Sequence, residues 1–380
     1  MRILYLDAFH GGSHAAIAQG YTRHSRHDIT LLALPIDGGW RWRMRGAAVT
    51  FARQLRERAD TRSFDLIIAT DMLDLATFLG LTRDIIGTTP VAIYFHENQL
   101  TYPLPAGRTR DLAFPWINYT SALVADAVIF NSDFHRRALL GALPDLIGRF
   151  HDHQERDLFP QIAAKSHVLH PGVDLARLDS STPLERDSGT QAPVILWNSR
   201  WEYDKNPTAF FTALDELERR GVDFRLIVVG EHIDPQHAEF LSARERFGPR
   251  ALAWGYVPDT ASYARLLHQA DLVVSTAMQE FFGVSMVEAM YCGCAPIAPR
   301  RLSYPELIPE ALHSFSLYDS DAELADRLVT VLGNLPDDIC ATARAAAAQY
   351  DWAHMAPRYD ALFTQIAAAH AILTNLPYAV

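Results

Sequence analysis

Residues 1–24, MRILYLDAFHGGSHAAIAQGYTRH, contain the local pattern on which the fold prediction rests. An apolar run at 2–8 predicts a buried strand, and apolar residues at helical spacing in 14–24 predict a helix. The glycines between them, Gly11 and Gly12, let the backbone approach a ligand closely, and the free amides of the following helix favour an anion. A tight turn that binds no ligand is the alternative. The glycine spacing is not GxGxxG, so a dinucleotide cofactor is poorly supported.

The same alternation of strand and helix continues along the chain and predicts its fold class. Further strands are expected at 29–34, 65–69, 91–95, 126–130, 166–170, 194–198, 225–229, 251–254, 271–275 and 295–298. Further helices are expected at 43–59, 112–125, 207–220, 236–247, 260–268 and 284–292. Such alternation indicates parallel sheets covered by helices on both faces. The sequence therefore predicts an α/β protein with two doubly wound domains, whose ligands bind at the carboxyl ends of the strands.

A polar, turn-forming stretch at 176–193 separates the two predicted sheets. It contains SSTP at 180–183 and DSGT at 187–190, which are typical of a linker between domains. The linker is expected to separate an N-terminal domain at 1–175 from a second domain at 194–351. A C-terminal segment at 352–380, with a helix at 352–374, is expected to follow.

Composition limits the class of protein. The 380 residues suffice for two domains of about 150 residues, and a hydrophobic content of 49% excludes a disordered chain. Three cysteines cannot form a disulfide framework, and no apolar stretch reaches the roughly 20 residues of a membrane span. The first seven residues fit a strand rather than a signal peptide. We therefore expect a soluble, cytoplasmic protein with no membrane partner and make no prediction of its oligomeric state.

Charge is distributed unevenly. Residues 1–175 contain 18 basic and 18 acidic residues, whereas 176–380 contain 16 and 27, so the net charge of −11 lies in the second half. A neutral first half with a basic patch leaves nucleic-acid binding open. The segment Trp40-Arg41-Trp42-Arg43-Met44-Arg45 is such a patch, because arginine binds phosphates and tryptophan stacks on unpaired bases. An amphipathic helix with solvated arginines is the alternative.

Two predicted strands are followed by side chains that suit a ligand. His96-Glu97-Asn98-Gln99 comes directly after the strand at 91–95, where such a polar row favours a cleft over a solvated loop. Arg200 and Lys205 follow the strand at 194–198 and are suited to a diphosphate. Lysine is rare in this chain, which favours the anion role, although a surface ion pair with a nearby carboxylate is the alternative.

The segment Glu280-Phe281-Phe282-Gly283 carries the sharpest signal. A helix is predicted to start after its glycine, and the free amides of that helix can bind hydroxyls or phosphate. Glu288 lies further along the helix among apolar residues, where an idle charge would be costly. Together, Glu280 and Glu288 would present two carboxylates to a polyol-rich ligand.

Metal binding is weakly indicated. His151-Asp152-His153 could ligate a metal, but no further ligands follow at zinc-site spacing. Cys292 and Cys294 flank a glycine at a predicted helix end, where packing in the core is the favoured role. We therefore predict no metal and no resident cofactor.

These motifs together resemble those of the retaining glycosyltransferases of family four, which have the GT-B fold. Glu280 and Glu288 match the E-x7-E motif of that family. The resemblance implies two Rossmann-like domains that face a central cleft, with a C-terminal helix that crosses back to the N-terminal domain. AFHGGSH at 8–14, YFHENQL at 94–100 and VIFNS at 128–132 extend it to a narrower group. Enzymes of that group transfer mannose from GDP-mannose to the queuosine base in the anticodon of an aspartate tRNA.

The resemblance implies particular roles on the phosphate side of the donor. Arg200 and Lys205 match the pair that neutralises the diphosphate, without a metal-binding DxD motif. Gly12, next to Gly11, matches the glycine whose amide meets the donor phosphate, and His96 matches the histidine beside the transferred sugar. Because the leaving phosphate is thought to take the acceptor proton in this family, His96 is expected to position substrate.

The resemblance also implies roles for the E-x7-E motif and the acceptor loop. Glu280 and the amides of residues 281–283 match the positions that hold the sugar hydroxyls, and Glu288 matches the ribose-binding glutamate. Residues 97–99 and the patch at 40–45 are the expected acceptor contacts.

Two other functions fit the same residues. The first is a transferase of the same fold whose acceptor is a saccharide, a lipid or a small metabolite and whose sugar nucleotide differs. The second is a catalytically silent sensor of sugar nucleotides, against which the intact set Arg200, Lys205, Glu280 and Glu288 argues. Guanine and uracil cannot be distinguished, because base recognition often uses backbone groups.

Overall fold

The structure is a computed structural model that describes residues 1–58, 63–105, 107–179, 192–231 and 238–375. It divides into two compact units, one formed by residues 1–172 with the segment from 352 onward and the other by residues 173–351. Each unit is built on its own six-stranded sheet, in agreement with the predicted fold class. The part of the expected linker at 180–191 lies outside the described residues. Residues 176–178 form a 3-10 turn of the second unit, which the sequence had placed in that linker.

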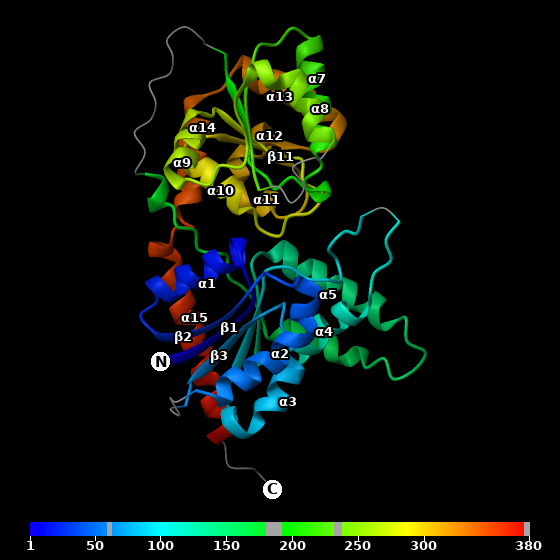
Figure 1. Ribbon diagram of the computed structural model, residues 1–380, viewed down its shortest axis with the longest axis vertical. Helices are drawn as coiled ribbons and strands as arrows, with labels where there is room; N and C mark the ends of the chain where they lie inside the picture. The colour runs from blue at the N-terminus through cyan, green and yellow to red at the C-terminus, as the bar shows by residue number, and fades with distance from the viewer. Residues whose placement is uncertain (59–62, 106, 180–191, 232–237, 376–380) are drawn as a thin grey trace. The chain divides into compact units, whose positions relative to one another are not determined.

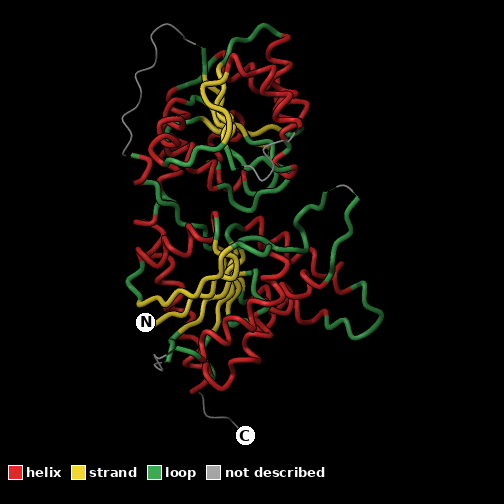
Figure 2. Tube along the Cα trace, in the orientation of Figure 1, coloured by secondary structure: helices red, strands yellow, loops and turns green. Residues whose placement is uncertain are grey.

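The sheet of the first unit is parallel and has the order β2-β1-β3-β4-β5-β6. Its strands are β1 (Arg2–His10), β2 (Asp28–Pro35), β3 (Leu66–Thr70), β4 (Val91–Phe95), β5 (Ala127–Phe130) and β6 (Ser166–Val168). The helices between and beside them are α1 (Gly12–His24), α2 (Trp40–Arg56), α3 (Leu75–Ile86), α4 (Ala113–Val124), α5 (Asp133–Ile147) and α6 (Phe159–Ala164), the last two both between β5 and β6. Helix α1 lies on one face of the sheet and α2, α3 and α4 lie on the other (Figures 1 and 2). Every residue of β3, β4 and β5 is buried as a result.

Helix α15 (Trp352–Asn375) packs against α1 and completes the first unit. The ring of Trp352 is buried against Gly20 and Gly172, where an added methyl group would overlap ring atoms. The buried carboxylate of Asp360 accepts a hydrogen bond from the hydroxyl of Tyr21 at 3.0 Å. The C-terminal helix therefore returns to the N-terminal domain, as the resemblance implied.

The sheet of the second unit is also parallel and has the order β12-β11-β10-β7-β8-β9. Its strands are β7 (Val194–Trp197), β8 (Arg225–Val229), β9 (Ala251–Gly255), β10 (Leu272–Val274), β11 (Ala295–Pro299) and β12 (Leu317–Tyr318). Its helices are α7 (Pro207–Arg219), α8 (Ala238–Phe247), α9 (Thr260–Gln269), α10 (Val284–Tyr291), α11 (Tyr304–Leu307), α12 (His313–Ser316), α13 (Leu324–Gly333) and α14 (Asp337–Ala348). Helices α7, α8 and α13 cover one face, and α9, α10 and α14 cover the other (Figure 1).

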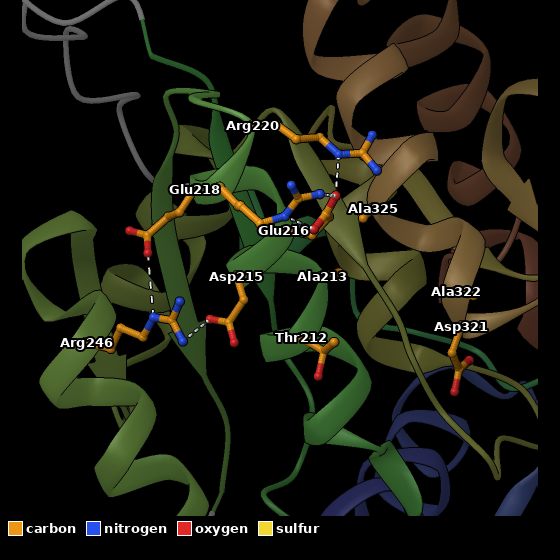
Figure 3. A pocket seen from close by; sticks show the side chains of 11 residues that line it. Thr212, Ala213, Asp215, Glu216, Glu218, Arg220, Arg246, Asp321, Ala322 and Ala325 are labelled. Atoms are coloured by element: carbon orange, nitrogen blue, oxygen red, sulfur yellow. Dashed lines mark hydrogen bonds and ion pairs between the residues drawn. The ribbon is translucent and has the colours of Figure 1, made fainter.

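A charged groove of about 750 Å³ lies on the outer face of the second unit, along α7, α8 and α13 (Figure 3). Arg246 of α8 pairs with Asp215 of α7 at 2.6 Å, and Arg220 pairs with Glu216 at 2.6 Å. Hydrogen bonds from Arg219, then Arg220, lower the pKa of Glu216 to about 2. The arginines at the end of α7 and in α8 that face this groove are thus paired with carboxylates of α7, and exposed pairs of this kind contribute little to stability.

The order of the strands shows where ligands of this fold bind. Strand order reverses at β1 in the first unit and at β7 in the second, and open parallel sheets bind ligands at such points. The places to examine are therefore the loops after β1 and its neighbour β3, with the loop after the adjacent strand β4, and the loops after β7 and β10. In the described part of the chain, no helix combines the length and the apolar character needed to cross a membrane.

Candidate active site

Lys205 is a buried cation at the carboxyl end of the second sheet. It lies in a 3-10 turn after β7, and its Nζ donates to the carbonyl oxygen of Gln279 at 2.8 Å. The same nitrogen lies 3.2 Å from the Glu280 carboxylate and 3.5 Å from that of Asp204. The Lys205 side chain is 10% exposed. The Lys205–Glu280 pair joins the loops after β7 and β10, so the folded chain brings two predicted site residues into contact.

Backbone hydrogen bonds hold these two loops in register. The amide of Met278 donates to the carbonyl of Asp204 at 2.8 Å, and the hydroxyl of Thr276 donates to the carbonyl of Lys205 at 2.8 Å. The side-chain nitrogen of Gln279 is buried and has no hydrogen-bond partner among the described residues. Lys205 and Glu280 are therefore fixed by the backbone as well as by their charges.

Arg200 lines a separate pocket of about 240 Å³ beyond the end of β7. Its guanidinium is half exposed and lies 3.4 Å from the carboxylate of Glu202, so the surface pair expected as an alternative does form. The pocket is completed by Asn198, Gly230 and Tyr256 with five neighbouring residues. A side chain at Gly230 would overlap the backbone of Ser199, which explains the glycine at this position.

The E-x7-E motif spans the turn into α10. Gly283 precedes the helix with a φ of +107°, a conformation that favours glycine. Phe281 and Phe282 are buried, and the amide of Phe282 points at the Glu280 carboxylate at 3.4 Å. The buried rings therefore anchor the loop that carries Glu280.

Glu288, on α10, is buried and doubly bound. One carboxylate oxygen pairs with Arg177, and the other accepts the hydroxyl of Tyr263 at 2.9 Å. Asn198 in turn donates to the Tyr263 hydroxyl at 3.1 Å. Burial raises the pKa of Glu288, and the charge of Arg177 opposes that rise. Sequence reasoning missed Arg177, which it had placed in the linker, and it missed Tyr263.

His96 is the centre of the corresponding site in the first unit. Its buried ring stacks on that of His14, with centroids 4.0 Å apart, and its amide donates to the carboxylate of Asp71 at 2.8 Å. Burial, followed by the neighbouring His14, holds the pKa of His96 well below its usual range, so the ring is neutral. Its Nε2 is buried with no partner in the described part of the chain. An unpaired nitrogen of this kind can serve a substrate hydroxyl.

The glycine turn after β1 has the predicted strand-to-helix geometry. Gly12 begins α1 with a φ of +52°, and a side chain at Gly11 would overlap Ile36. Directly before them, the buried carboxylate of Asp7 lies 2.6 Å from the ring of His10. This contact fixes the end of β1.

The polar row after β4 largely bonds to itself. The side-chain oxygen of Asn98 accepts the amide of Thr101 at 2.8 Å, and the Gln99 side chain donates to Glu97 at 2.7 Å. Asn98 and Gln99 are buried, and Glu97 is partly exposed. Asn98 therefore shapes the loop, and Glu97 is the most accessible of the three predicted acceptor contacts.

The tryptophan–arginine patch forms the first turns of α2, which begins at residue 40 rather than at the predicted 43. Trp40 packs on Phe114 with ring centroids 4.9 Å apart, and Arg41 lies over the Trp40 ring at 4.5 Å. Trp42 is 62% exposed.

The other two arginines of this patch make contacts within the unit. Arg43 donates to the carbonyl of Pro35 at 2.7 Å, and Arg45 pairs with Asp111 at 2.8 Å. Arg110, the neighbour of Asp111, donates to the carbonyl of Tyr102 at 2.6 Å. The patch is thereby linked to the loop that begins at His96.

The weaker candidates are the stretch 151–153 and two of the cysteines. Asp152 and His153 form an exposed pair at 3.8 Å, and the described residues contain no cluster of three or more side chains suited to a metal. Cys292 and Cys294 are buried free thiols.

Solved structures with the same architecture define the class. Sucrose-phosphate synthase from Thermosynechococcus elongatus superimposes with a TM-score of 0.72 at 15% identity, over 97% of this chain and 100% of that one. Anabaena HepE, solved with UDP and glucose, gives 0.66 at 18% identity, over 96% and 99%. At such identities they show the fold alone, which is the GT-B fold. Residues 184–345 match the family model for group 1 glycosyl transferases, so the chain is a glycosyltransferase.

Sequence comparison narrows the class further. Residues 2–173 match the N-terminal family model of tRNA-queuosine alpha-mannosyltransferase. The Drosophila melanogaster enzyme of that name is 33% identical over 333 residues, which cover 86% of this chain and 85% of the relative. GDP-mannose:cellobiosyl-diphosphopolyprenol alpha-mannosyltransferase from Xanthomonas campestris is 26% identical over 74% of this chain and 69% of its own. The chain belongs to the tRNA-queuosine alpha-mannosyltransferase family.

Proposed function

We propose that this protein transfers mannose from GDP-mannose to the queuosine base of tRNA, with retention of the anomeric configuration. The observation that carries the proposal is the match of residues 2–173 to the family of queuosine-modifying enzymes, because the first unit is the expected acceptor domain. The two relatives described above, whose names both specify alpha-mannosyl transfer, support mannose as the sugar.

In this proposal the second unit holds the donor. Arg200 and Lys205 meet the charge that develops on the leaving diphosphate, as fixed cations do for a transition state. Glu280, held by Lys205 at 3.2 Å, accepts hydrogen bonds from hydroxyls of the sugar, and the amides of residues 281–283 donate to sugar oxygens. Glu288 accepts the ribose hydroxyls, and the pocket beside Arg200 takes the nucleoside.

The first unit then positions the acceptor. An acceptor oxygen bonds to the anomeric carbon as the bond from that carbon to the diphosphate breaks, and its proton passes to the leaving phosphate. His96 is neutral and acts by hydrogen bonding beside the sugar. Because the leaving phosphate takes the proton, no side-chain base is required. Trp42 and the arginines of α2 contact the RNA.

Mass spectrometry of digested tRNA tests the proposal. Queuosine-containing and queuosine-free tRNA are incubated with the protein and with GDP-mannose, GDP-glucose or UDP-glucose. We expect one added hexose on queuosine with GDP-mannose, and turnover that survives exhaustive chelation because Arg200 and Lys205 supply the cationic charge. Transfer to queuosine-free tRNA, or no transfer to queuosine with any donor, would reject the acceptor. Loss of turnover with EDTA that a divalent ion restores would reject metal independence.

A further inference from the structure

Arg177 lies at the very start of the second unit. The short 3-10 turn Ala176–Leu178 carries it, soon after the boundary between the units at 172/173. The turn is fixed to its own unit, because Leu178 is buried and its carbonyl accepts the ring nitrogen of His268 at 3.0 Å. The Arg177 Nε also donates to the carbonyl of Asp174 at 3.1 Å. The guanidinium is therefore held in place from its backbone outward.

The side chains around Glu288 occupy only part of the hydrogen-bonding capacity of its carboxylate. Arg177 takes one carboxylate oxygen and the Tyr263 hydroxyl takes the other, while Asn198 donates to both Tyr263 and the carbonyl of Ser285. A carboxylate has about four acceptor directions, two on each oxygen. Each oxygen of Glu288 consequently keeps an acceptor direction beyond these two contacts.

The titratable groups near Glu288 come from several elements. Arg177 and Tyr263 contact it from the 3-10 turn and from α9, and Cys292 follows directly after the end of α10. Arg344 of α14 lies over the Tyr291 ring and pairs with Asp179 at 3.7 Å. Burial raises the pKa of the Cys292 thiol to about 12, so this group stays neutral. Arg177 is the cation in direct contact with the carboxylate.

We propose that Arg177 is a positioning residue of the donor site, which orients the Glu288 carboxylate to accept the vicinal diol of a nucleoside ribose. The inference rests on the proposed function, which gives Glu288 its ribose contact. A guanidinium binds a carboxylate from one side in a planar geometry and leaves the opposite lone pairs free. Burial alone raises the pKa of Glu288, so loss of Arg177 makes this carboxyl take up a proton at a higher pH.

Binding of GDP by the full-length protein at pH 5.5, 7 and 8.5 tests the inference, with GDP and 2′,3′-dideoxy-GDP as probes. We expect Arg177→Met to bind GDP about 10- to 100-fold more weakly than wild type at pH 8.5, the range for loss of a charged hydrogen bond. The difference in GDP affinity between Arg177→Met and wild type should increase as the pH falls, because protonation of Glu288 removes one of the oxygens that can accept a hydrogen bond. Dideoxy-GDP, which lacks the diol, binds both proteins equally.

Matched variants separate positioning from folding. Arg344→Met removes a nearby arginine that does not contact Glu288 and should leave GDP binding unchanged. Arg177→Lys keeps a positive charge at this position, so its GDP affinity relative to wild type should change less with pH than that of Arg177→Met. In the double variant Arg177→Met/Glu288→Gln, the ratio of its GDP affinity to that of wild type should no longer change with pH.

Three results with Arg177→Met would overturn the inference. The first is a loss of GDP affinity that is the same at every pH, the second is an equal loss of affinity for dideoxy-GDP, and the third is normal GDP binding. The proposed function fails differently. If wild type bound GDP and dideoxy-GDP equally, the ribose contact of Glu288 would be wrong, and with it this inference. If the diol preference and its dependence on Arg177 held but queuosine received no hexose, the acceptor alone would be wrong.

Discussion

The two units assemble their candidate residues in opposite ways. In the second unit, opposite charges touch, with the buried Lys205 against Glu280 and Arg177 against the buried Glu288. In the first unit, the central pair is two stacked rings, His96 and His14, and burial keeps His96 neutral. Both arrangements lie near the point where strand order reverses.

This difference matches the chemistry that each unit is proposed to serve. A diphosphate gains charge as it leaves, so its partner surface needs fixed cations whose positions are set beforehand. An acceptor hydroxyl is neutral, and a neutral ring orients it without attracting the leaving group. Variants that disturb one unit should therefore produce effects of a different kind from those that disturb the other.

The largest effect is expected from Lys205→Met. By comparison with loss of one contact to a developing anion, turnover at saturating donor should fall about 10²- to 10³-fold. The variant also leaves Asp204 and Glu280 without their cation, and breaking a buried pair typically costs about 3–5 kcal/mol. Rates and urea unfolding measure the two losses separately.

Lys165→Met is the matched control, because the chain has two lysines. The Lys165 ammonium donates to the carbonyl of Leu123 at 2.7 Å near the end of α4, so its loss should reduce stability and leave donor turnover in the folded protein unchanged. Equal loss of turnover in both variants would show that stability, and not charge at the site, explains the result.

The next largest effect is expected from a substitution that causes a steric clash in the core of the first unit. Gly20→Ala places a methyl group where the Trp352 ring lies, and overpacking of this kind costs about 1–3 kcal/mol. Gly141→Ala, in α5, meets open space and should stabilise by about 0.5–1 kcal/mol. Thermal unfolding compares the two. If Gly20→Ala were as stable as wild type, the packing of α15 on α1 would be wrong.

The fold was largely predictable because both sheets consist of apolar runs separated by helical periods. Each strand expected from the sequence is present to within about two residues. The structure adds one strand that was not expected, β12 (Leu317–Tyr318), which has too few residues to show a periodicity. Helix α2 starts earlier than expected because Gly38 and Gly39, with φ of +88° and +78°, end the preceding turn just before Trp40.

The site was predictable in its motifs and not in its contacts. Arg200, Lys205, Glu280, Glu288 and His96 were singled out from their positions after strands or within a motif, and their roles remain predictions. The partner of Glu288 was not found, because Arg177 is 111 positions away from it and no spacing rule joins the two. Strand order brings such residues together, and strand order is not written in any local pattern.

A smaller effect should appear as a pH dependence of stability in the first unit. His135 is buried beside Asn131 at 2.8 Å, and burial holds its pKa well below the usual value. The unfolded chain takes up a proton at this position as the pH falls through about 6.5, so acid favours unfolding by at most about 1.4 kcal/mol per pH unit.

The variant His135→Gln isolates this contribution, because the buried Asp71 carboxyl, whose pKa is raised, acts in the opposite direction in both proteins. Urea midpoints between pH 7 and pH 5 should fall less for the variant than for wild type. Parallel curves would mean that His135 is protonated in the folded protein.

The smallest effect concerns the exposed ring of the α2 patch and tests the acceptor surface. Trp42 is 62% exposed, so Trp42→Ala should leave stability unchanged and weaken tRNA binding by about 1 kcal/mol, at the lower end for a stacked base. Trp40→Ala is the contrasting variant, because Trp40 packs on Phe114 and its loss should reduce stability first. Removing Arg41 should reduce the salt dependence of tRNA binding by about one counterion if it contacts a phosphate. GDP binding should be the same in all three variants.

Unchanged tRNA affinity in Trp42→Ala, measured at several salt concentrations, would leave the patch as an ordinary surface helix and move the RNA contact elsewhere on the first unit.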